Sequence, residues 1–88
     1  MIQVKILSYL SPQRYVVRRV ILAAQAELQK ESPGLRIEII ELKDWVHIEQ
    51  YTPVLSAPSL VVNEKLVCVG TVPSRQDVIG WLKSAINE

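Results

Sequence analysis

Cysteine and histidine occur only once each in these 88 residues. The single cysteine, Cys68, has no partner for an intramolecular disulfide or for the dithiol pair that a redox relay needs. The lone His47 has no second histidine or cysteine at the spacing of metal ligands. The sequence therefore predicts no metal site, no bound cofactor and no dithiol chemistry.

Long apolar runs and a strong net charge are missing as well. The net charge of +1 gives no overall field that would favour nucleic acid or an anionic membrane. No apolar stretch approaches the length of a membrane span. The segment Met1–Leu7 alternates like a strand and lacks the basic region and long apolar run of a secretory signal. We therefore expect a cytoplasmic protein that binds neither nucleic acid nor membrane.

The charges that are present are unevenly distributed. Residues 1–30 hold five basic residues and one acidic residue, a net charge of +4. Residues 31–64 hold six acidic residues and two basic ones, a net charge of −4. Arg14, Arg18 and Arg19 account for much of the basic excess, and all three fall in one predicted helix. That helix is expected to have a basic face, with no aromatic platform for nucleic-acid bases beside it.

Hydrophobic periodicity divides the chain into four strands and three helices. Apolar residues recur at three- and four-residue steps from Val16 to Leu28, which is typical of a helix, whereas the strands are short apolar runs. No repeat, linker or low-complexity segment interrupts this pattern. The expected elements are, in order, a strand over Ile2–Leu7, a helix from Ser11 to about Lys30, a strand over Leu35–Leu42, a short helix through about Gln50, a loop over Tyr51–Ala57, strands over Ser59–Val62 and Lys65–Val69, and a helix opened by Ser74.

Residues typical of helix starts precede each predicted helix. Ser11 suits the N-cap of the long helix, with Pro12 at the first helical position, where the missing N–H costs nothing. Ser74 and Asp77 form a capping box at the last helix. Asp44 is expected to cap the short helix.

The short helix and the turn between the last two strands carry their own expectations. The short helix is predicted to bury Trp45 and Ile48. Asn63-Glu64, between the last two strands, has the spacing of a tight hairpin turn. The order β-α-β-α-β-β-α over residues 1–88 predicts a single α/β domain with a four-stranded mixed sheet and helices on both faces. Its first two strands should be parallel with a right-handed crossover.

This order of elements, together with Ala57-Pro58-Ser59 before the hairpin, resembles the thioredoxin-like superfamily, and in particular its small glutaredoxin-sized members. In that family a small or hydrophobic residue, a cis proline and then Thr or Ser lead into the third strand. The resemblance implies a thioredoxin-like fold, a cis peptide bond at Ala57–Pro58, and a third strand antiparallel to the first. Gly70 and Pro73-Ser74 are similar to the family's usual continuation into the last helix.

The redox Cys-x-x-Cys of that family falls on Ser11, Pro12, Gln13 and Arg14 in this chain. The resemblance places Ser11 at the nucleophile and Arg14 at the resolving thiol, and neither is cysteine. A serine hydroxyl is not ionised near neutral pH, so thiol–disulfide exchange through these four residues is excluded. The family's glutathione-binding positions are poorly matched as well, because Gly70 is followed by Thr71-Val72.

The leading hypothesis is a redox-inactive module that binds a protein or peptide. The resemblance gives its binding face as Ser11, Pro12, Gln13 and Arg14, with Ala57, Pro58 and Ser59, and with Gly70, Thr71 and Val72; Arg18 lies one turn beyond Arg14. Two structural interpretations compete with this one, because Ser11 has a role as an N-cap and Pro58 as a rigid turn. The alternative function is a thiol–disulfide oxidoreductase that acts through Cys68 alone, and a homodimer is a third possibility.

Overall fold

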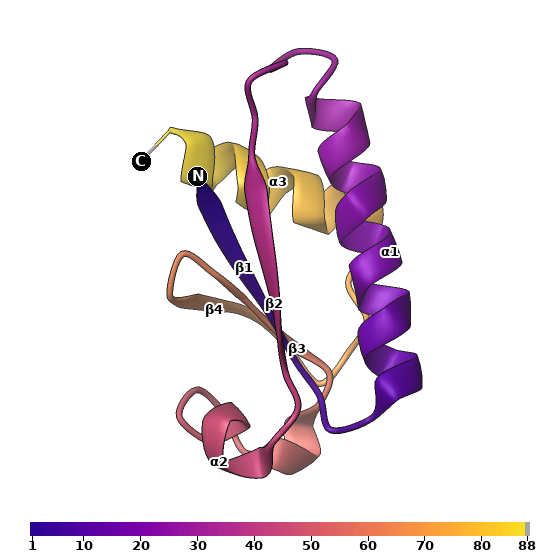
Figure 1. Ribbon diagram of the computed structural model, residues 1–88, viewed down its shortest axis with the longest axis vertical. Helices are drawn as coiled ribbons and strands as arrows, with labels where there is room; N and C mark the ends of the chain where they lie inside the picture. The colour runs from indigo at the N-terminus through magenta and orange to yellow at the C-terminus, as the bar shows by residue number, and fades with distance from the viewer. Residues whose placement is uncertain (88) are drawn as a thin grey trace.

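The computed structural model describes residues 1–87 and contains the predicted elements in the predicted order (Figure 1). The strands are short, and α1 is the longest element. In Figure 1, α1 stands beside the sheet, α3 runs across its upper part, and α2 lies at its lower end. The elements are β1 (Ile2–Leu7), α1 (Ser11–Leu28), β2 (Ile37–Leu42), α2 (Trp45–Ile48), the 3₁₀ helix η1 (Val54–Ser56), β3 (Ser59–Val62), β4 (Lys65–Val69) and α3 (Arg75–Ile86).

The four strands form one mixed sheet in the order β2-β1-β3-β4. β1 is parallel to β2, as a β-α-β unit requires, and antiparallel to β3. The antiparallel pairing of β1 with β3 confirms the topology that the family resemblance implied. Asn63 and Glu64 both have positive φ, at 47° and 68°, and join β3 to β4 in the tight turn that their spacing predicted.

The main core lies between one face of the sheet and the pair α1 and α3. Alternate residues of β1 point into it, because successive side chains of a strand face opposite ways. The helices contribute residues at three- and four-residue steps. Its buried members are Ile2, Val4, Ile6, Val17, Ile21, Ala24, Leu28, Leu60, Val62, Cys68, Val78, Ile79 and Leu82.

A smaller core lies on the opposite face, under α2 and η1. Leu7, Ile48 and Val61 are fully buried there, and Leu42, Tyr51 and Val54 pack against them. Helices therefore cover both faces, as predicted, but unequally, since α2 has only four residues. Beyond α2 this face carries a polar group in which the Lys5 ammonium donates hydrogen bonds to Tyr51 and Glu64, and the Tyr51 hydroxyl donates to Glu64 at 2.9 Å.

The capping hydrogen bonds predicted for α1 and α2 do not form, and at α1 the predicted N-cap position is wrong as well. The N-cap position of α1 is Leu10, Ser11 is already helical, and no side chain caps the helix. Asp44 occupies the N-cap position of α2, but its side chain makes no capping hydrogen bond. At α3 the prediction is confirmed, because the Ser74 hydroxyl accepts a hydrogen bond from the Asp77 amide at 3.1 Å.

Ser8 organises the turn that Ser11 was expected to cap. Its hydroxyl accepts a hydrogen bond from the Leu10 amide at 3.1 Å and donates to the Gln13 side chain at 2.6 Å. Ser8 is fully buried, so these bonds satisfy a group that would be costly to leave unpaired. The link between β1 and α1 is thus fixed three residues earlier than the sequence indicated.

Of the two α2 residues that were predicted to be buried, one is buried and the other is exposed. Ile48 is fully buried, but the side chain of Trp45 is 63% exposed. A single helical turn directs few positions at the sheet, and Ile48 fills that contact. Other boundaries shift by a few residues: α1 ends at Leu28, β2 begins at Ile37, and the predicted loop contains η1.

Candidate functional site

The predicted site residues gather at one end of the sheet, here called the α2 end. β1, β2 and β4 finish there and β3 begins there, because Leu7 pairs with both Leu42 and Ser59, and Ser59 pairs with Val69. The turns that leave or enter these strands therefore lie together. They carry the start of α1, the Ala57–Pro58 turn, and Gly70 with Thr71.

The Ala57–Pro58 peptide bond is cis, as the resemblance implied. The Pro58 carbonyl accepts a hydrogen bond from the Gly70 amide at 2.9 Å, which ties the two turns together. The Ser59 hydroxyl donates to the Ser56 carbonyl at 2.8 Å. Gly70 has φ of +76°, a conformation that glycine adopts without strain. Pro58 and Ser59 are buried, Ala57 is half-buried, and Gly70 is exposed.

The four residues that the resemblance aligns with the family's redox pair differ in their exposure to solvent. Ser11 and Pro12 are exposed at the start of α1, whereas Gln13 and Arg14 are half-buried. Gln13 is engaged by the Ser8 hydroxyl. Because none of the four side chains contains sulfur, the start of α1 holds no group capable of thiol–disulfide exchange.

Arg14 and Arg18 both bind Glu41, at the end of β2. Arg14 Nε lies 3.1 Å from Glu41 Oε1, and Arg18 Nη1 lies 2.7 Å from Glu41 Oε2. Arg14 also donates to the Ser8 carbonyl at 2.9 Å, and its side chain is only 11% exposed. Both carboxylate oxygens are therefore occupied, and an external anion would have to displace Glu41 to use these donors. Sequence reasoning left Glu41 out of the site.

Cys68 lies in β4 and belongs to the main core beneath α3, with 9% of its surface exposed. Burial is the main cause that raises the pKa of the Cys68 thiol, and the nearby Asp77 carboxylate raises it further. The thiol donates a hydrogen bond to the Thr71 carbonyl at 3.3 Å, which helps to keep the proton on the sulfur. A thiol with a raised pKa is a poor nucleophile at neutral pH, because the thiolate is the reacting form.

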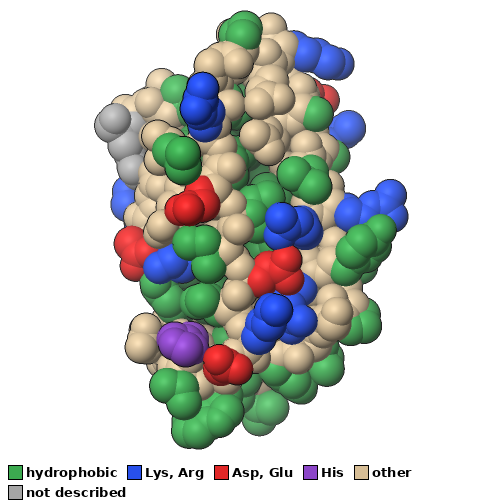
Figure 2. All heavy atoms as spheres, viewed as in Figure 1, with side chains coloured by type: hydrophobic (Ala, Val, Ile, Leu, Met, Phe, Trp, Pro, Cys, Tyr) green, Lys and Arg blue, Asp and Glu red, His purple; other side chains and the backbone are tan. Residues whose placement is uncertain are grey.

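The sequence missed an apolar hollow at the α2 end. Its volume is about 550 Å³. Tyr9, Trp45 and Leu55, which border it, are 50%, 63% and 86% exposed. Figure 2 shows hydrophobic side chains gathered at this lower end of the molecule. The signal in the sequence was four large apolar residues outside the strands and the two long helices. The lining residues are Tyr9, Lys43, Asp44, Trp45, Val54 and Leu55.

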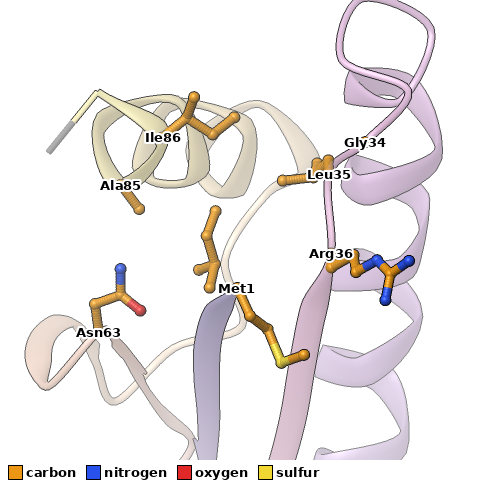
Figure 3. A pocket seen from close by; sticks show the side chains of 8 residues that line it. Met1, Gly34, Leu35, Arg36, Asn63, Ala85 and Ile86 are labelled. Atoms are coloured by element: carbon orange, nitrogen blue, oxygen red, sulfur yellow. The ribbon is translucent and has the colours of Figure 1, made fainter.

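A second hollow, of about 300 Å³, lies at the opposite end of the sheet (Figure 3). Met1, Leu35, Asn63 and Ala85 border it. Among the described residues that line it, Arg36 has the only charged side chain, and Figure 3 shows its guanidinium pointing away from Asn63 and Ala85. This hollow therefore offers neither charge nor a nucleophile to a ligand.

The mixed sheet, the cis bond at Ala57–Pro58 and the missing cysteine pair define a thioredoxin-like α/β domain with a single cysteine. A family profile described as "Thioredoxin domain" matches residues 16–83, and the chain belongs to that family. The matched range begins after Ser11–Arg14, so the alignment of those residues with the redox pair rests on their place in the fold. Comparisons with curated proteins and with solved structures give no match. Within residues 1–87, no helix has the length and apolar character needed to cross a membrane.

We expect Cys68 of the folded protein to react with a thiol reagent at neutral pH at least about tenfold more slowly than an exposed cysteine, because little thiolate is present. Labelling with Ellman's reagent measures this rate, with the Cys68→Ser, Ser84→Cys protein as the exposed reference. Fast labelling, or reduction of insulin that disappears in Cys68→Ser, would favour the one-cysteine oxidoreductase instead.

Proposed function

We propose that this thioredoxin-family domain binds an extended segment of another protein at the α2 end and does so without redox chemistry. The observation that carries the proposal is the apolar hollow between Tyr9, Trp45 and Leu55. It lies next to the Ala57–Pro58 turn, since η1 leads directly into Ala57. The segment that fits is one with a large apolar or aromatic side chain.

Exposure of these side chains supports a binding role. Large apolar groups gain free energy when they leave water, so three of them around one hollow form a surface that is stabilised by being covered. Tyrosine and tryptophan are also enriched at the centres of protein interfaces. Lys43 and Asp44, at the rim, add one charge of each sign. Such a rim suits a peptide whose apolar side chain enters the hollow and whose neighbouring residues are polar.

The chemistry of the start of α1 supports the absence of catalysis. Ser11 and Arg14 stand where the family has its thiols, and Cys68 is buried elsewhere. Arg14 and Arg18 share the Glu41 carboxylate and Arg14 is largely buried, so the exposed apolar residues are the more accessible binding groups. The proposed binding surface therefore differs from the one predicted from the sequence, which was centred on Ser11–Arg14.

Leu55→Asp is expected to weaken peptide binding by about tenfold or more, because it places a charge in an apolar contact. The probes are polar peptides that differ only in a central Trp, Leu or Ala. In a Trp81→Phe background, the emission of Trp45 should shift to shorter wavelength with the Trp and Leu peptides, and not with the Ala peptide.

Leu66→Asp serves as the matched control, since Leu66 is 40% exposed on β4 away from the α2 end. It should leave peptide affinity unchanged. The proposal fails if the Trp and Leu peptides cause no shift, or if Leu55→Asp and Leu66→Asp weaken binding equally.

A further inference from the structure

The outer side of α1 carries a second apolar stripe that the core does not use. Tyr15, Val16 and Leu22 are 61%, 45% and 46% exposed. Ala23 and Ala26, on the same side, are exposed as well. Arg19 lies four residues after Tyr15 and four before Ala23, so these positions form one face of the helix with Arg19 within it. Small residues at the middle of that face would let another helix approach closely.

A hollow of about 350 Å³ runs beside this stripe, between α1 and the start of α3. It is apolar at its base and basic at its edge, where Arg19 and Arg75 stand. Figure 2 shows basic side chains gathered on the α1 side of the molecule. The lining residues are Tyr15, Val16, Arg19, Val20, Ala23 and Arg75.

Arg19 and Arg75 have no carboxylate partner among residues 1–87, unlike Arg14 and Arg18. Arg19 lies over the Tyr15 ring, 5.8 Å from its centroid. Arg75 is in the first turn of α3, where the helix dipole disfavours a positive charge. Neither arginine is therefore explained by an ion pair.

Two carboxylates at the other end of the same helix are also unpaired. Glu27 is half-buried in the last turn of α1, and Glu31 is exposed just beyond it. No salt bridge among residues 1–87 includes either one. The apolar face of α1 therefore has basic groups at one end and acidic groups at the other, with Ala23 midway between Arg19 and Glu27.

We propose that this face binds a second copy of the chain, with the two α1 helices antiparallel and in contact near Ala23. In that register Arg19 lies opposite Glu27 of the second copy, and Arg75 lies near the second copy's Glu27 and Glu31. The two-fold axis makes each pair occur twice, which is the form of a self-complementary interface. A parallel arrangement would bring like charges together. This inference uses a different face from the proposed function and does not depend on it.

A charge swap tests the interface. Sedimentation equilibrium over a concentration series should show a monomer–dimer equilibrium for the natural chain. Arg19→Glu and Glu27→Arg should each weaken the dimer by about tenfold, because like charges then face each other. The double variant Arg19→Glu, Glu27→Arg should dimerise more tightly than either single variant, since the pairs between positions 19 and 27 are restored with reversed sign, although Arg75 then lies near a basic rather than an acidic side chain at position 27. Arg36→Glu, which changes an exposed arginine elsewhere, should have no effect.

A cysteine at the proposed axis gives a second measurement that does not depend on the charged variants folding well. In a Cys68→Ser background, Ala23→Cys should form a disulfide-linked dimer on mild oxidation, because small residues let the helices approach within disulfide range. Ser84→Cys, exposed on α3, should remain monomeric under the same conditions. A monomer at every concentration, a charge swap without recovery, or equal cross-linking by the two cysteines would each overturn the proposal.

Discussion

Ile48→Ala should lower the free energy of unfolding by about 2–4 kcal/mol, because it removes a fully buried side chain and leaves a cavity. Ile48 is the one residue by which α2 contacts the smaller core, where it packs with Leu7 and Val61. Its carbonyl also accepts hydrogen bonds from the amides of Tyr51 and Thr52, at 3.0 Å and 3.1 Å. Few other contacts hold this end of the molecule in place.

The consequence for function is that the loss should concentrate at the α2 end. Urea unfolding measures the total change, and hydrogen exchange shows where it is largest: amides of α2 and η1 should lose more protection than those of α1 and α3. Val46→Ala is the control, since Val46 is in the same helical turn but 52% exposed, and it should change stability by less than about 0.5 kcal/mol. A uniform loss of protection throughout the sheet would contradict this account.

Peptide binding by Ile48→Ala should be lost together with the structure of the α2 end. Trp45 is on α2, and the fold fixes it only through Ile48 and its neighbours. In Ile48→Ala, Trp45 is expected to lose its position at the hollow while the main core remains folded. An Ile48→Ala protein that is folded in the absence of urea and yet no longer binds the Trp and Leu peptides would identify α2 as the element that positions the site.

The strands were predictable because each is a short apolar run that can be recognised from its own residues. β1, β3 and β4 have the bounds that were predicted, since their apolar runs are limited by turn residues such as Asn63-Glu64. β2 begins two residues later than predicted. Leu35 packs against the core without taking part in the ladder, and apolarity alone does not distinguish these two roles.

Ser11 and Trp45 show where local signals fail. Serine is a typical N-cap residue, but Ser11 is not the N-cap of α1. The buried hydroxyl of Ser8 fixes the turn before the helix, and the N-cap position is Leu10, one residue earlier than predicted. Trp45 is apolar, but a helix of one turn has room for one inward position and Ile48 takes it. Both outcomes depend on tertiary packing, which propensity does not describe.

The sequence predicted which turns lie together at the α2 end, but it did not predict all of the residues that the structure brings together there. The family resemblance found the turns at the α2 end, because the order of elements fixes which strand ends meet. It did not find Glu41, which lies 27 residues from Arg14 in the chain and meets it only through the position of α1 against β2. It also did not find the hollow, whose lining comes from three separate segments: the turn after β1, the start of α2 and η1.

Glu41→Gln should lower the free energy of unfolding by about 1–3 kcal/mol, because it leaves Arg14 partly buried without a compensating charge. The carboxylate binds Arg14 through one oxygen and Arg18 through the other. An amide of the same size keeps one acceptor but directs its N–H groups at an arginine, so at least one of the two bonds is lost. Most of the effect should come from Arg14, since Arg18 is 41% exposed and water screens its pair.

Glu38→Gln is the matched control for this prediction. Glu38 is on the same strand but exposed, and it accepts a hydrogen bond only from the Gln3 side chain at 3.1 Å. Its loss should cost less than about 0.5 kcal/mol, as surface substitutions usually do. Urea unfolding of both variants gives the comparison, and equal losses would mean that Glu41 has no special role.

A double-mutant cycle then separates the two arginines. Arg14→Met and Arg18→Met, each combined with Glu41→Gln, should show a larger coupling energy for Arg14 than for Arg18, because the Arg14 side chain is the more buried. Such an order would show that Arg14 anchors α1 to β2. A larger coupling energy for Arg18 than for Arg14 would contradict this role. It would favour the binding face predicted from the sequence, in which Arg14 is available to a ligand.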